Sequence, residues 1–576
     1  MSYAPSQVIL MSEINSADLM ALCKRRGFIW PSFELYGGVA GMYDYGPLGC
    51  SLRNNIVEVW RSIYKGREGF VEIDSDTVNP REVFKASGHV DEFADLITYC
   101  KECQAPFRAD HMVKDFYDNP DILSPKQLEE AFVKHNIRCP ECGGELGPVD
   151  EFNLMFRTNI GPGSARVGYL RPETAQGIFV NFPNLYRYNR EKLPLGVIQT
   201  GRSYRNEIAP RQGMIRLREF NQMEVELFVD PEDKDWARFE DIQDETIRLV
   251  PNTTGELVEM TVKEAVDKGI IANRVLAYFV NTTKQLLLKL GVDPQRLRFR
   301  QHLDDEMAHY AADCWDAEVL LSYGWTEITG IADRGCWDLS RHAQFSGTEL
   351  THFKKYDEPR EMEVTKVRAK HKALGPLFKG KAKDIAAAIE SLVPGDVKDG
   401  KISLEIDGEV KEFGEEFFEV VTVKEKVAGE RVVPHVIEPS HGLDRIFYSV
   451  LEHAYEYDAE KDYTVLHLAP VVAPIKVGVF PLMEKDGLDD VARSIYEGIH
   501  THRVEAYYDG SGTIGKRYAR MDEVGTPWCI TVDYDTLENG TVTIRDRDTT
   551  EQKRIPKDDA ARIVDELLSG KPFADL

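Results

Sequence analysis

The stretch that decides the fold runs from Ser203 to Phe228 and reads SYRNEIAPRQGMIRLREFNQMEVELF. With the preceding residues from Gly196, it predicts two antiparallel strands joined by a loop at Ile208–Met214, where Pro and Gly interrupt the alternation. Successive side chains of a strand point to opposite faces, so one face of this pair is polar. That face comprises Gln199, Ser203, Arg205, Glu207, Arg216, Arg218, Phe220, Gln222, Glu224 and Glu226. The apolar face comprises Leu217, Met223, Val225 and Leu227.

This polar face has two interpretations. Cross-strand salt bridges on a half-exposed sheet are the common role of such opposed charges. The charges are, however, ordered along the face, with arginines at one end, an aromatic ring in the middle and carboxylates at the other end. Arginine suits phosphate, an aromatic ring suits a planar base, and a carboxylate suits an ammonium group. The order therefore favours a binding site for an aminoacyl adenylate.

The chain is long and acidic. Its 576 residues exceed what one hydrophobic core organises and predict about three or four domains or large insertions. The net charge of 71 − 97 = −26 argues against nucleic-acid binding over the whole surface but allows a local basic patch. No apolar run is long enough for a membrane span, and the N-terminus lacks the pattern of a signal peptide. We therefore expect a cytoplasmic protein with no membrane partner.

Local patterns divide the rest of the chain. Apolar residues at helical spacing predict a helix over Leu52–Tyr64, and a strand is expected from Phe70. Residues from about 100 to 150 and from about 346 to 430 interrupt the main pattern as two insertions. From Ala469 onward, strands and helices alternate, which predicts a small α/β domain.

Four of the nine cysteines form two C-x-x-C pairs, Cys100 with Cys103 and Cys139 with Cys142. Four thiolates in two such turns suit a tetrahedral zinc ion. A closed site of four cysteines leaves no coordination position open, so we expect a structural role. Four unrelated cysteines are the alternative, and a redox-active C-x-x-C is disfavoured because there are two pairs.

Several motifs make the chain resemble the class II aminoacyl-tRNA synthetases. Tyr204–Glu207 matches the F-R-x-E signature, Glu438–Arg445 (EPSHGLDR) matches the C-terminal G-x-x-R signature, and Leu52–Pro80 matches the first signature of a helix, a strand and a proline. The strings YDYGPLG, GYLRPETAQGIF, RQHLDDEMAHYAADCWDAE and VIEPS are similar to those of glycyl-tRNA synthetases of the archaeal and eukaryotic type. The resemblance covers nearly the whole chain.

This resemblance implies an α+β fold on an antiparallel sheet of about six or seven strands with flanking helices. A zinc-binding insertion and a second insertion with a possible tRNA contact would interrupt the catalytic core, and an α/β anticodon-binding domain would follow it. The class also implies a homodimer with Leu52–Pro80 at its interface. The expected boundaries are 1–99 (with the dimer-forming motif), 153–345 and 431–468 for the core, 100–152 and 346–430 for the insertions, and 469–576 for the anticodon-binding domain.

The implied reaction joins glycine and ATP to give glycyl-adenylate and pyrophosphate, and then moves glycine to the terminal adenosine of tRNA(Gly). By resemblance, Arg205 binds the α-phosphate and the glycine carboxylate, and Arg216 binds the outer phosphates. Glu207 binds the adenine amino group, while Phe220 and Arg445 cover the two faces of the adenine. Catalysis is assigned to Arg205, Glu207 and Arg445.

Magnesium is the second cofactor that the resemblance implies. Glu327 and Glu438 would hold Mg²⁺ that bridges the phosphates of ATP. The other ATP-binding positions carried over from the motifs are Asn206, Ile215, Leu217, Ile328 and Gly442.

Glycine offers an ammonium group, a carboxylate and almost nothing else to recognise. By resemblance, Glu173, Glu224 and Ser440 bind it, together with Gln222 and Glu438. Carboxylates around the α-carbon make the pocket small and negative, so it excludes larger amino acids and needs no editing domain. For Glu173 the alternative is a helix-capping role, because it lies near an expected helix start.

Two further residues have open roles. Glu226 shares the polar face with Glu224, and a structural salt bridge explains it equally well. Arg108, in the string FRADH, follows the first cysteine pair and is a tentative ligand of the substrate or of the tRNA end.

The tRNA must be held by local rather than global charge. The stretch from Lys366 to Lys383, KVRAKHKALGPLFKGKAK, contains no acidic residue and is the best candidate for this contact. A solvated lysine-rich surface explains the stretch equally well. The zinc-binding insertion is a second candidate, near the acceptor end.

Two other functions are compatible with parts of this pattern. A catalytically silent relative would bind tRNA or another protein, but we expect such a relative to lose the site arginines and glutamates that are present here. A synthetase for serine, proline or threonine would share the class signatures, although VIEPS and RPETAQ favour glycine.

Overall fold

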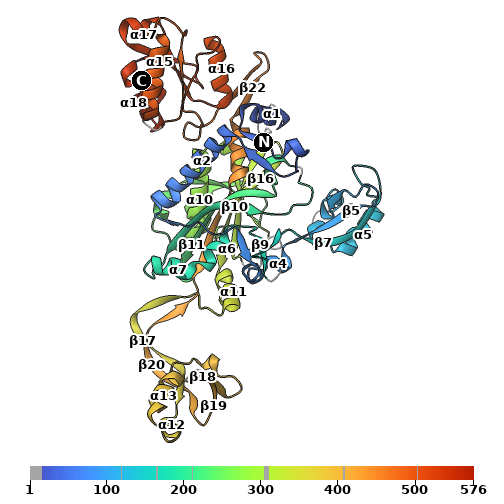
Figure 1. Cartoon of the computed structure of the whole chain (residues 1–576), viewed down its shortest axis with the longest axis vertical. Helices are drawn as coiled ribbons and strands as arrows, with labels where there is room; N and C mark the ends of the chain where they lie inside the picture. The colour runs from blue at the N-terminus through green and yellow to red at the C-terminus, as the bar shows by residue number, and fades with distance from the viewer. Residues whose placement is uncertain are drawn as a thin grey trace, which may run out of the picture. The chain divides into compact units, whose positions relative to one another are not determined.

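The computed structural model describes residues 16–117, 120–163, 166–210, 212–303, 311–406, 409–501 and 504–576 (Figure 1). The chain divides into two compact units, one formed by residues 351–433 and the other by the residues on either side. Part of the motif at 300–318 lies outside the described residues, because the description stops at Leu303 and resumes at Ala311. No helix among the described segments combines the length and the apolar character that crossing a bilayer requires.

A nine-stranded sheet forms the centre of the larger unit, in the order β13-β12-β14-β15-β16-β21-β11-β10-β3. The strands from β14 to β10 are antiparallel throughout, whereas β12 and β3 join them through parallel pairing. The expected antiparallel sheet is therefore found at the centre and is extended at both edges. In the same order the strand bounds are Val258–Thr261, Thr246–Val250, Leu297–Gln301, Asp313–Leu321, Gly324–Gly335, His435–Gly442, Glu219–Val229, Leu195–Tyr204 and Val71–Glu72.

The stretch that begins at Ser203 forms the end of β10, a loop and β11. β10 ends at Tyr204 and β11 begins at Glu219, so both strands are shorter at the loop end than the alternation predicts. The predicted polar face is not exposed: Glu224 and Glu226 are fully buried. The reason is that helix α6 (Ala175–Val180) packs against β10 and β11 and removes this part of the sheet from solvent.

Helices α10 (Arg274–Lys289) and α14 (Leu443–Ala454) pack on the sheet, and α2 (Pro47–Arg61) packs against α14. α2 confirms the helix expected from Leu52 and begins at a proline, whose fixed φ suits the first turn of a helix. It continues as a π-helical turn to Arg67. Apolar residues on these helices and on the sheet form the main hydrophobic core.

The start of α2 packs against the backbone of Gly27 and Phe28. The amides of Leu48 and Gly49 donate hydrogen bonds of 3.0 and 3.3 Å to the carbonyl oxygen of Gly27. A Cβ atom on Gly49 would lie 1.8 Å from the carbonyl oxygen of Phe28, a distance that no side chain can occupy. The last glycine of YDYGPLG therefore allows the helix to begin in contact with this segment.

The strand expected from Phe70 is split in two. Its first part, β3, is the edge strand of the main sheet, and its second part, β4 (Val78–Pro80), belongs to a small sheet with the order β4-β9-β8. The remaining helices and strands in this part of the larger unit are α3 (Arg81–Ala86), α4 (His89–Glu92), β8 (Arg157–Asn159), β9 (Val167–Leu170) and α7 (Phe182–Tyr188).

The cysteine-bearing segment has its own small sheet, in the order β6-β5-β7, and its own apolar core. Because β5 pairs with β7 from its first residue, this sheet begins at Ala94, ahead of the boundary expected at residue 100. Helix α5 starts with reciprocal hydrogen bonds between Ser124 and Gln127. The bounds are Ala94–Cys100 for β5, Pro106–Arg108 for β6, Leu146–Asn153 for β7 and Pro125–Lys134 for α5.

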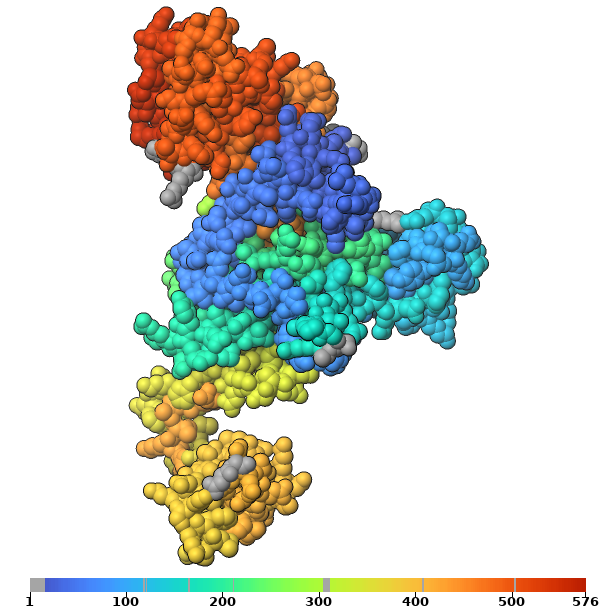
Figure 2. Space-filling model, in the orientation of Figure 1, coloured from blue at the N-terminus to red at the C-terminus, as the bar shows by residue number. Residues whose placement is uncertain are grey.

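Residues 351–433 form a compact body of their own, drawn in yellow to orange in Figure 2. β17 (His352–Ala369) and β20 (Phe418–Val432) make a long antiparallel ribbon. The basic stretch from Lys366 to Lys383 covers the end of β17, α12 and the start of α13. The other elements are α12 (His371–Phe378), α13 (Ala382–Glu390), β18 (Lys401–Ile406) and β19 (Glu409–Gly414).

The C-terminal part confirms the alternation of strands and helices expected after Ala469. Its five-stranded sheet has the order β25-β24-β26-β27-β28, with parallel pairing around β24 and antiparallel pairing beyond β26. The strands, in chain order from β24, are Val477–Pro481, Ala506–Tyr508, Trp528–Val532, Thr541–Asp546 and Gln552–Pro556. The helices, in chain order from α15, are Leu488–Thr501, Ile514–Val524, Tyr534–Asn539 and Ala560–Leu568.

Candidate active site

A cavity of about 180 Å³ opens where β10, β11, β16 and β21 meet the start of α14. All the expected ATP-binding residues line it except Asn206, whose backbone amide donates to the carbonyl oxygen of Leu154 at 2.7 Å. Of the residues expected to bind glycine, Gln222 and Ser440 reach the cavity, and the three glutamates do not line it. The full lining is Arg205, Glu207, Met214, Ile215, Arg216, Leu217, Phe220, Asn221, Gln222, Glu327, Ile328, Gly330, Ser440, Gly442, Asp444 and Arg445.

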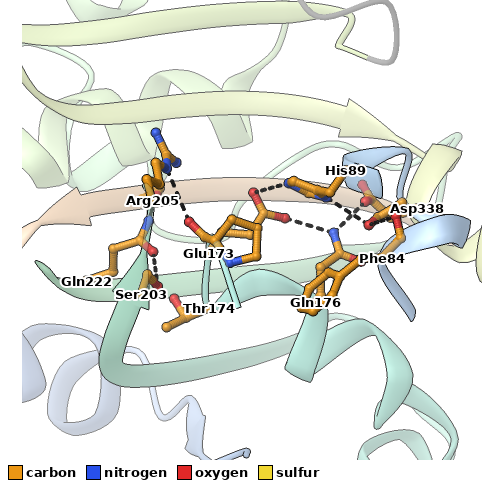
Figure 3. Close-up of polar contacts among 12 residues, drawn as sticks. Phe84, His89, Glu173, Thr174, Gln176, Ser203, Arg205, Gln222 and Asp338 are labelled. Carbon is orange, nitrogen blue, oxygen red and sulfur yellow. Dashed lines mark hydrogen bonds and ion pairs between the residues drawn. The ribbon is translucent and has the colours of Figure 1, made fainter. Parts of the chain in front are cut away.

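Arg205 follows β10 directly and stands over an aromatic ring. Its backbone amide donates to the carbonyl oxygen of Arg218 at 2.9 Å, and its Nε donates to that of Pro172 at 3.2 Å (Figure 3). Its Cζ lies 5.2 Å from the centroid of Phe220 and 5.4 Å from that of Phe93. The guanidinium group therefore stands at the cavity, above the ring expected to carry the adenine.

Two further arginines reach the cavity from other parts of the chain. Arg216 Nε donates to Glu207 Oε2 at 2.6 Å. Arg445 Nη1 donates to Glu327 Oε2 at 3.1 Å, and its Nε donates to the carbonyl oxygen of Ile215 at 3.1 Å. These bonds hold planar cationic groups around one small volume, an arrangement that suits a polyanion such as a nucleotide triphosphate.

Glu224, Glu226 and Glu438 form a buried carboxylate cluster, in which one oxygen of each lies within 4.8 Å of the others. Glu224 lies opposite Ser440, which lines the cavity, and accepts a hydrogen bond of 2.8 Å from the hydroxyl of Thr174. The cluster is therefore adjacent to the cavity.

All three carboxyl groups of the cluster have a raised pKa. Burial and the neighbouring charge of Glu438 raise the pKa of Glu224 to about 8. Burial also raises the pKa of Glu438, and it raises that of Glu226 well above its ordinary value. Neither carboxylate oxygen of Glu226 has a hydrogen-bond partner in the described part of the chain, so the salt bridge considered for it is not formed.

Glu173 is held by side chains rather than by a helix end. Gln176 Nε2 donates to its Oε1 at 2.8 Å, and His89 Nε2 lies 3.6 Å from its Oε2 (Figure 3). Burial by itself would raise the pKa of Glu173, but His89, Arg334 and Gln176 outweigh burial and lower it. The N-cap of α6 is Thr174, so the capping role considered for Glu173 is wrong.

Sequence reasoning missed a buried cation and its partner. Arg334 Nη1 donates to Glu438 Oε2 at 2.6 Å, while its Nε and Nη2 donate to the two oxygens of Asp338 at 2.8 and 3.0 Å. All three side chains are buried. Pairs spaced by four residues are common on helix surfaces, so this spacing does not single out a buried pair.

Asp444 is a second residue that sequence reasoning missed. It is buried within the quoted string EPSHGLDR, and it accepts hydrogen bonds from the backbone amide of Asn221 and from the hydroxyl of Tyr45. It thereby ties β11 to the start of α14, which carries Arg445. Sequence reasoning assigned roles to Glu438, Ser440, Gly442 and Arg445 of this string but none to Asp444.

The two residues expected to hold magnesium do not share one site. Glu438 lies opposite Ala332 in the sheet, and Glu327 lies five positions earlier on the same strand as Ala332. Five residues span about 16 Å along a strand, and two glutamate side chains binding one ion at about 2.1 Å cannot bridge this distance.

Asp316 is better placed than Glu438 to bind a metal ion together with Glu327. Asp316 lies opposite Gly330, which lines the cavity. Burial raises the pKa of Asp316, and the negative charge of Glu327 adds to this rise. The side chain of Glu327 is half exposed, and the charge and hydrogen bond of Arg445 lower its pKa. A divalent cation prefers such carboxylate oxygens, but it would compete here with His302 and Arg300, which lie 2.9 and 3.2 Å from Asp316 Oδ2.

The four paired cysteines come together. Sγ of Cys100 lies 3.4 Å from Sγ of Cys142, and Sγ of Cys103 lies 3.6 Å from Sγ of Cys139. Sulfurs bound tetrahedrally at about 2.3 Å from one zinc ion would be about 3.8 Å apart. The backbone amides of Cys103 and Glu102 donate to Sγ of Cys100 and lower the pKa of its thiol to about 7, whereas neighbouring thiols help to raise the pKa of Cys103 and of Cys142. The group therefore fits a zinc ion.

Arg108 lies in this same segment and does not line the cavity. Its Nε donates to Asp110 Oδ1 at 3.0 Å, and its Nη1 lies 3.2 Å from Asp95 Oδ2. Both carboxylates come from the segment itself, so these contacts explain Arg108 as part of the local structure.

The fold and its two functional regions match known families. Residues 163–454 match the family described as the tRNA synthetase class II core domain (G, H, P, S and T), and residues 476–567 match the anticodon binding domain. The solved structure of Giardia lamblia prolyl-tRNA synthetase in complex with prolyl-adenylate aligns with a TM-score of 0.53 and 15% identity, over 97% of this chain and 79% of that chain. These matches confirm the α+β fold of a class II core with an anticodon-binding domain.

Two known proteins are similar over almost their full length. The glycine–tRNA ligase of Methanothrix thermoacetophila is 53% identical over 555 residues, which cover 95% of this chain and 96% of that protein. The glycine–tRNA ligase of Methanocaldococcus jannaschii is 49% identical over 569 residues, which cover 96% and 98%. Since the similarity extends through the core, the insertions and the anticodon-binding domain, the chain belongs to the glycine–tRNA ligase family of class II tRNA synthetases.

Proposed function

We propose that the chain activates glycine with ATP and transfers it from glycyl-adenylate to the 3′-terminal adenosine of tRNA(Gly). The observation that carries this proposal is that a cavity lined by arginines lies next to a cluster of buried carboxylates, which Ser440 joins to it. The guanidinium groups of Arg205, Arg216 and Arg445 suit the phosphates of ATP, and the buried carboxylates around Glu224 suit an ammonium group.

The first step is an in-line displacement at the α-phosphate. A glycine carboxylate oxygen forms a bond to phosphorus, and the bond to the bridging oxygen of pyrophosphate breaks. The nucleophile is already ionised, so no general base is required, and positioning and charge neutralisation supply the rate. Arg205 is placed to neutralise charge at the α-phosphate, Arg216 at the outer phosphates, and Phe220 with Arg445 to cover the adenine.

The amino acid is selected by charge and by size. Glu173 and Glu224 would receive the ammonium group, and Gln222, Glu438 and Ser440 complete the pocket. An added methyl group would meet hydrogen-bonded carboxylates rather than a flexible apolar wall. Rejection of a larger substrate in this way costs the competitor a buried polar contact, so no editing step is required.

Two metal ions belong to the proposal. Mg²⁺ at Glu327 and Asp316 would neutralise phosphate charge, and Zn²⁺ at the four cysteines would stabilise the segment that carries them. Metal analysis of the purified protein should give about one zinc per chain, and Cys139→Ser should remove it. Full zinc content in that variant would rule out the site.

The remaining partners are tRNA(Gly) and a second copy of the chain. The anticodon-binding domain at residues 476–567 supports tRNA binding, and the stretch from Lys366 to Lys383 is the proposed second contact.

The proposed dimer contact is Leu52–Pro80, which sedimentation of wild-type protein and of an interface variant would test. The segment boundaries given above are also proposals. The proposed compartment is the cytoplasm, where translation uses the charged tRNA.

The decisive test is amino-acid-dependent exchange of labelled pyrophosphate into ATP, with glycine, alanine, serine, proline and threonine in parallel. This assay isolates the adenylate step and needs no tRNA. We expect exchange with glycine only, and its loss in Glu224→Ala. Exchange with a different amino acid would overturn the pocket assignment. No exchange from folded, magnesium-supplied protein would favour a silent relative that binds tRNA or another protein.

A further inference from the structure

A chain of buried polar side chains extends from Glu173 to a second helix. Gln176, on α6, donates through Nε2 to Glu173 Oε1 at 2.8 Å and to Asp338 Oδ1 at 3.2 Å (Figure 3). On its other side, Gln176 Oε1 lies 2.7 Å from His342 Nε2. Asp338 and His342 both belong to α11 (Trp337–Ser346). This helix therefore orients Gln176, which in turn orients the carboxylate of Glu173.

The hydrogen bonds assign the orientation of the Gln176 amide. An amide has a donor end and an acceptor end, and here the donor end faces two carboxylates. The acceptor end faces His342, and burial lowers the pKa of this imidazole, so its ring is neutral and donates through Nε2. Turning the amide over would place its oxygen against Glu173 and Asp338, and no water is available to Gln176, which is 1% exposed.

The side chains of Gln176 and His342 are 1% and 6% exposed, so neither is open to a substrate. Glu173 is only partly buried, with 15% of its side-chain surface accessible, and so remains open to a ligand. Its other contact, His89, is longer at 3.6 Å. The shorter of these two contacts that orient the Glu173 carboxylate is therefore the one from Gln176, which in turn depends on His342.

We propose that Gln176 and His342 are positioning residues for amino-acid selection, which hold the Glu173 carboxylate in the orientation that receives the ammonium group of glycine. The inference rests on the proposed function. Loss of either residue leaves the arginines and Phe220 in place, so binding of glycine should weaken while binding of ATP does not change.

The test compares His342→Leu, which removes the donor, with His342→Gln, whose amide can place a donor near the former Nε2. Michaelis constants for glycine and ATP are measured separately by pyrophosphate exchange. Losing a hydrogen bond that orients a charged group should raise the glycine constant about tenfold or more in His342→Leu, with the ATP constant within about twofold of wild type. His342→Gln should recover most of the loss. Gln344→Ala, an exposed position on α11, is the matched control.

A double variant distinguishes positioning from general damage to the fold. If His342 acts through Gln176, then Gln176→Met with His342→Leu should be no worse for glycine than Gln176→Met alone. Additive losses, equal rises in both Michaelis constants, or a His342→Gln variant no better than His342→Leu would each overturn the inference. Wild-type protein without glycine-dependent exchange would instead overturn the proposed function, and the inference with it.

Discussion

The side chain of Glu224 is fully buried beside Glu438, and burial together with that neighbour's charge raises its pKa to about 8. The only arginine bonded to this cluster among the described residues is Arg334, which pairs with Glu438 and Asp338. At neutral pH a proton therefore occupies the position where a substrate ammonium group would bring its charge. Proton and substrate should compete for the same carboxylate.

The first prediction concerns pH. Because the pKa of Glu224 is raised, the free protein holds this proton below about pH 8 and releases it above. We expect the Michaelis constant for glycine to fall as pH rises from about 6.5 to about 8.5, at most about tenfold per pH unit. The Michaelis constant for ATP over the same range is the internal control. A glycine constant that does not change with pH would show that Glu224 is already ionised at pH 6.5.

At the scale of elements, the beginning of α2 depends on a close approach between backbone segments. Gly49 lies on the carbonyl oxygen of Phe28, and backbone atoms cannot move aside as a flexible side chain can. The helix carries Leu52, Ile56 and Trp60 into the main core. A displacement at its first turn is therefore transmitted to buried side chains.

The second prediction follows from this approach. Gly49→Ala should lower the free energy of unfolding by about 2 kcal/mol or more, because an overpacked core shifts instead of absorbing the added methyl group. The measurement is the first thermal or urea transition. Gly66→Ala, where the new Cβ would lie 3.9 Å from the carbonyl oxygen of Arg61, is the control and should change the stability by less than about 1 kcal/mol. Equal effects of the two substitutions would contradict the packing argument.

Sequence reasoning was sound where elements are local. The order of charges from Arg205 to Glu224 and the two cysteine pairs are patterns within short stretches, and the structure brings each group together. Long-range register could not be predicted. Whether Glu327 and Glu438 lie side by side depends on which residue of β16 faces β21, and no periodicity encodes that pairing.

The buried partners were missed for the same reason. Arg334 meets Glu438 across a separation of 104 positions. His342 meets Gln176 across 166. Each residue has an unremarkable local context, so only the assembled fold reveals that it is buried next to the pocket.

At the scale of the whole molecule, the unit formed by residues 351–433 has an apolar core of its own. The fully buried members of that core all lie between Val367 and Phe418. Lys366 and Val421 face each other in the ribbon of β17 and β20. The ribbon can therefore be closed at this pair without opening the core of the larger unit.

The third prediction uses this closure point. Residues 367–420 are replaced by Asn-Gly, which forms a two-residue hairpin turn between Lys366 and Val421. Pyrophosphate exchange should stay within about twofold of wild type, because the excised core is separate. Charging of tRNA(Gly) should fall, since most of the basic stretch is removed. Unimpaired charging would contradict a tRNA contact there, and lost exchange would show that the cavity depends on this unit.

The ion pair between Arg334 and Glu438 also closes a loop of the chain, and the cost of closing it is entropic. The pair is a non-covalent cross-link at the base of a loop of about one hundred residues, in which α11 stays beside the pocket and the rest of the chain leaves it and returns at Glu438. The entropy of closing such a loop grows only logarithmically, and doubling its length adds about 0.6 kcal/mol. Evolution can therefore lengthen or shorten the chain between α11 and Glu438 with almost no effect on the buried network beside the cavity, and differences in length among relatives should gather there.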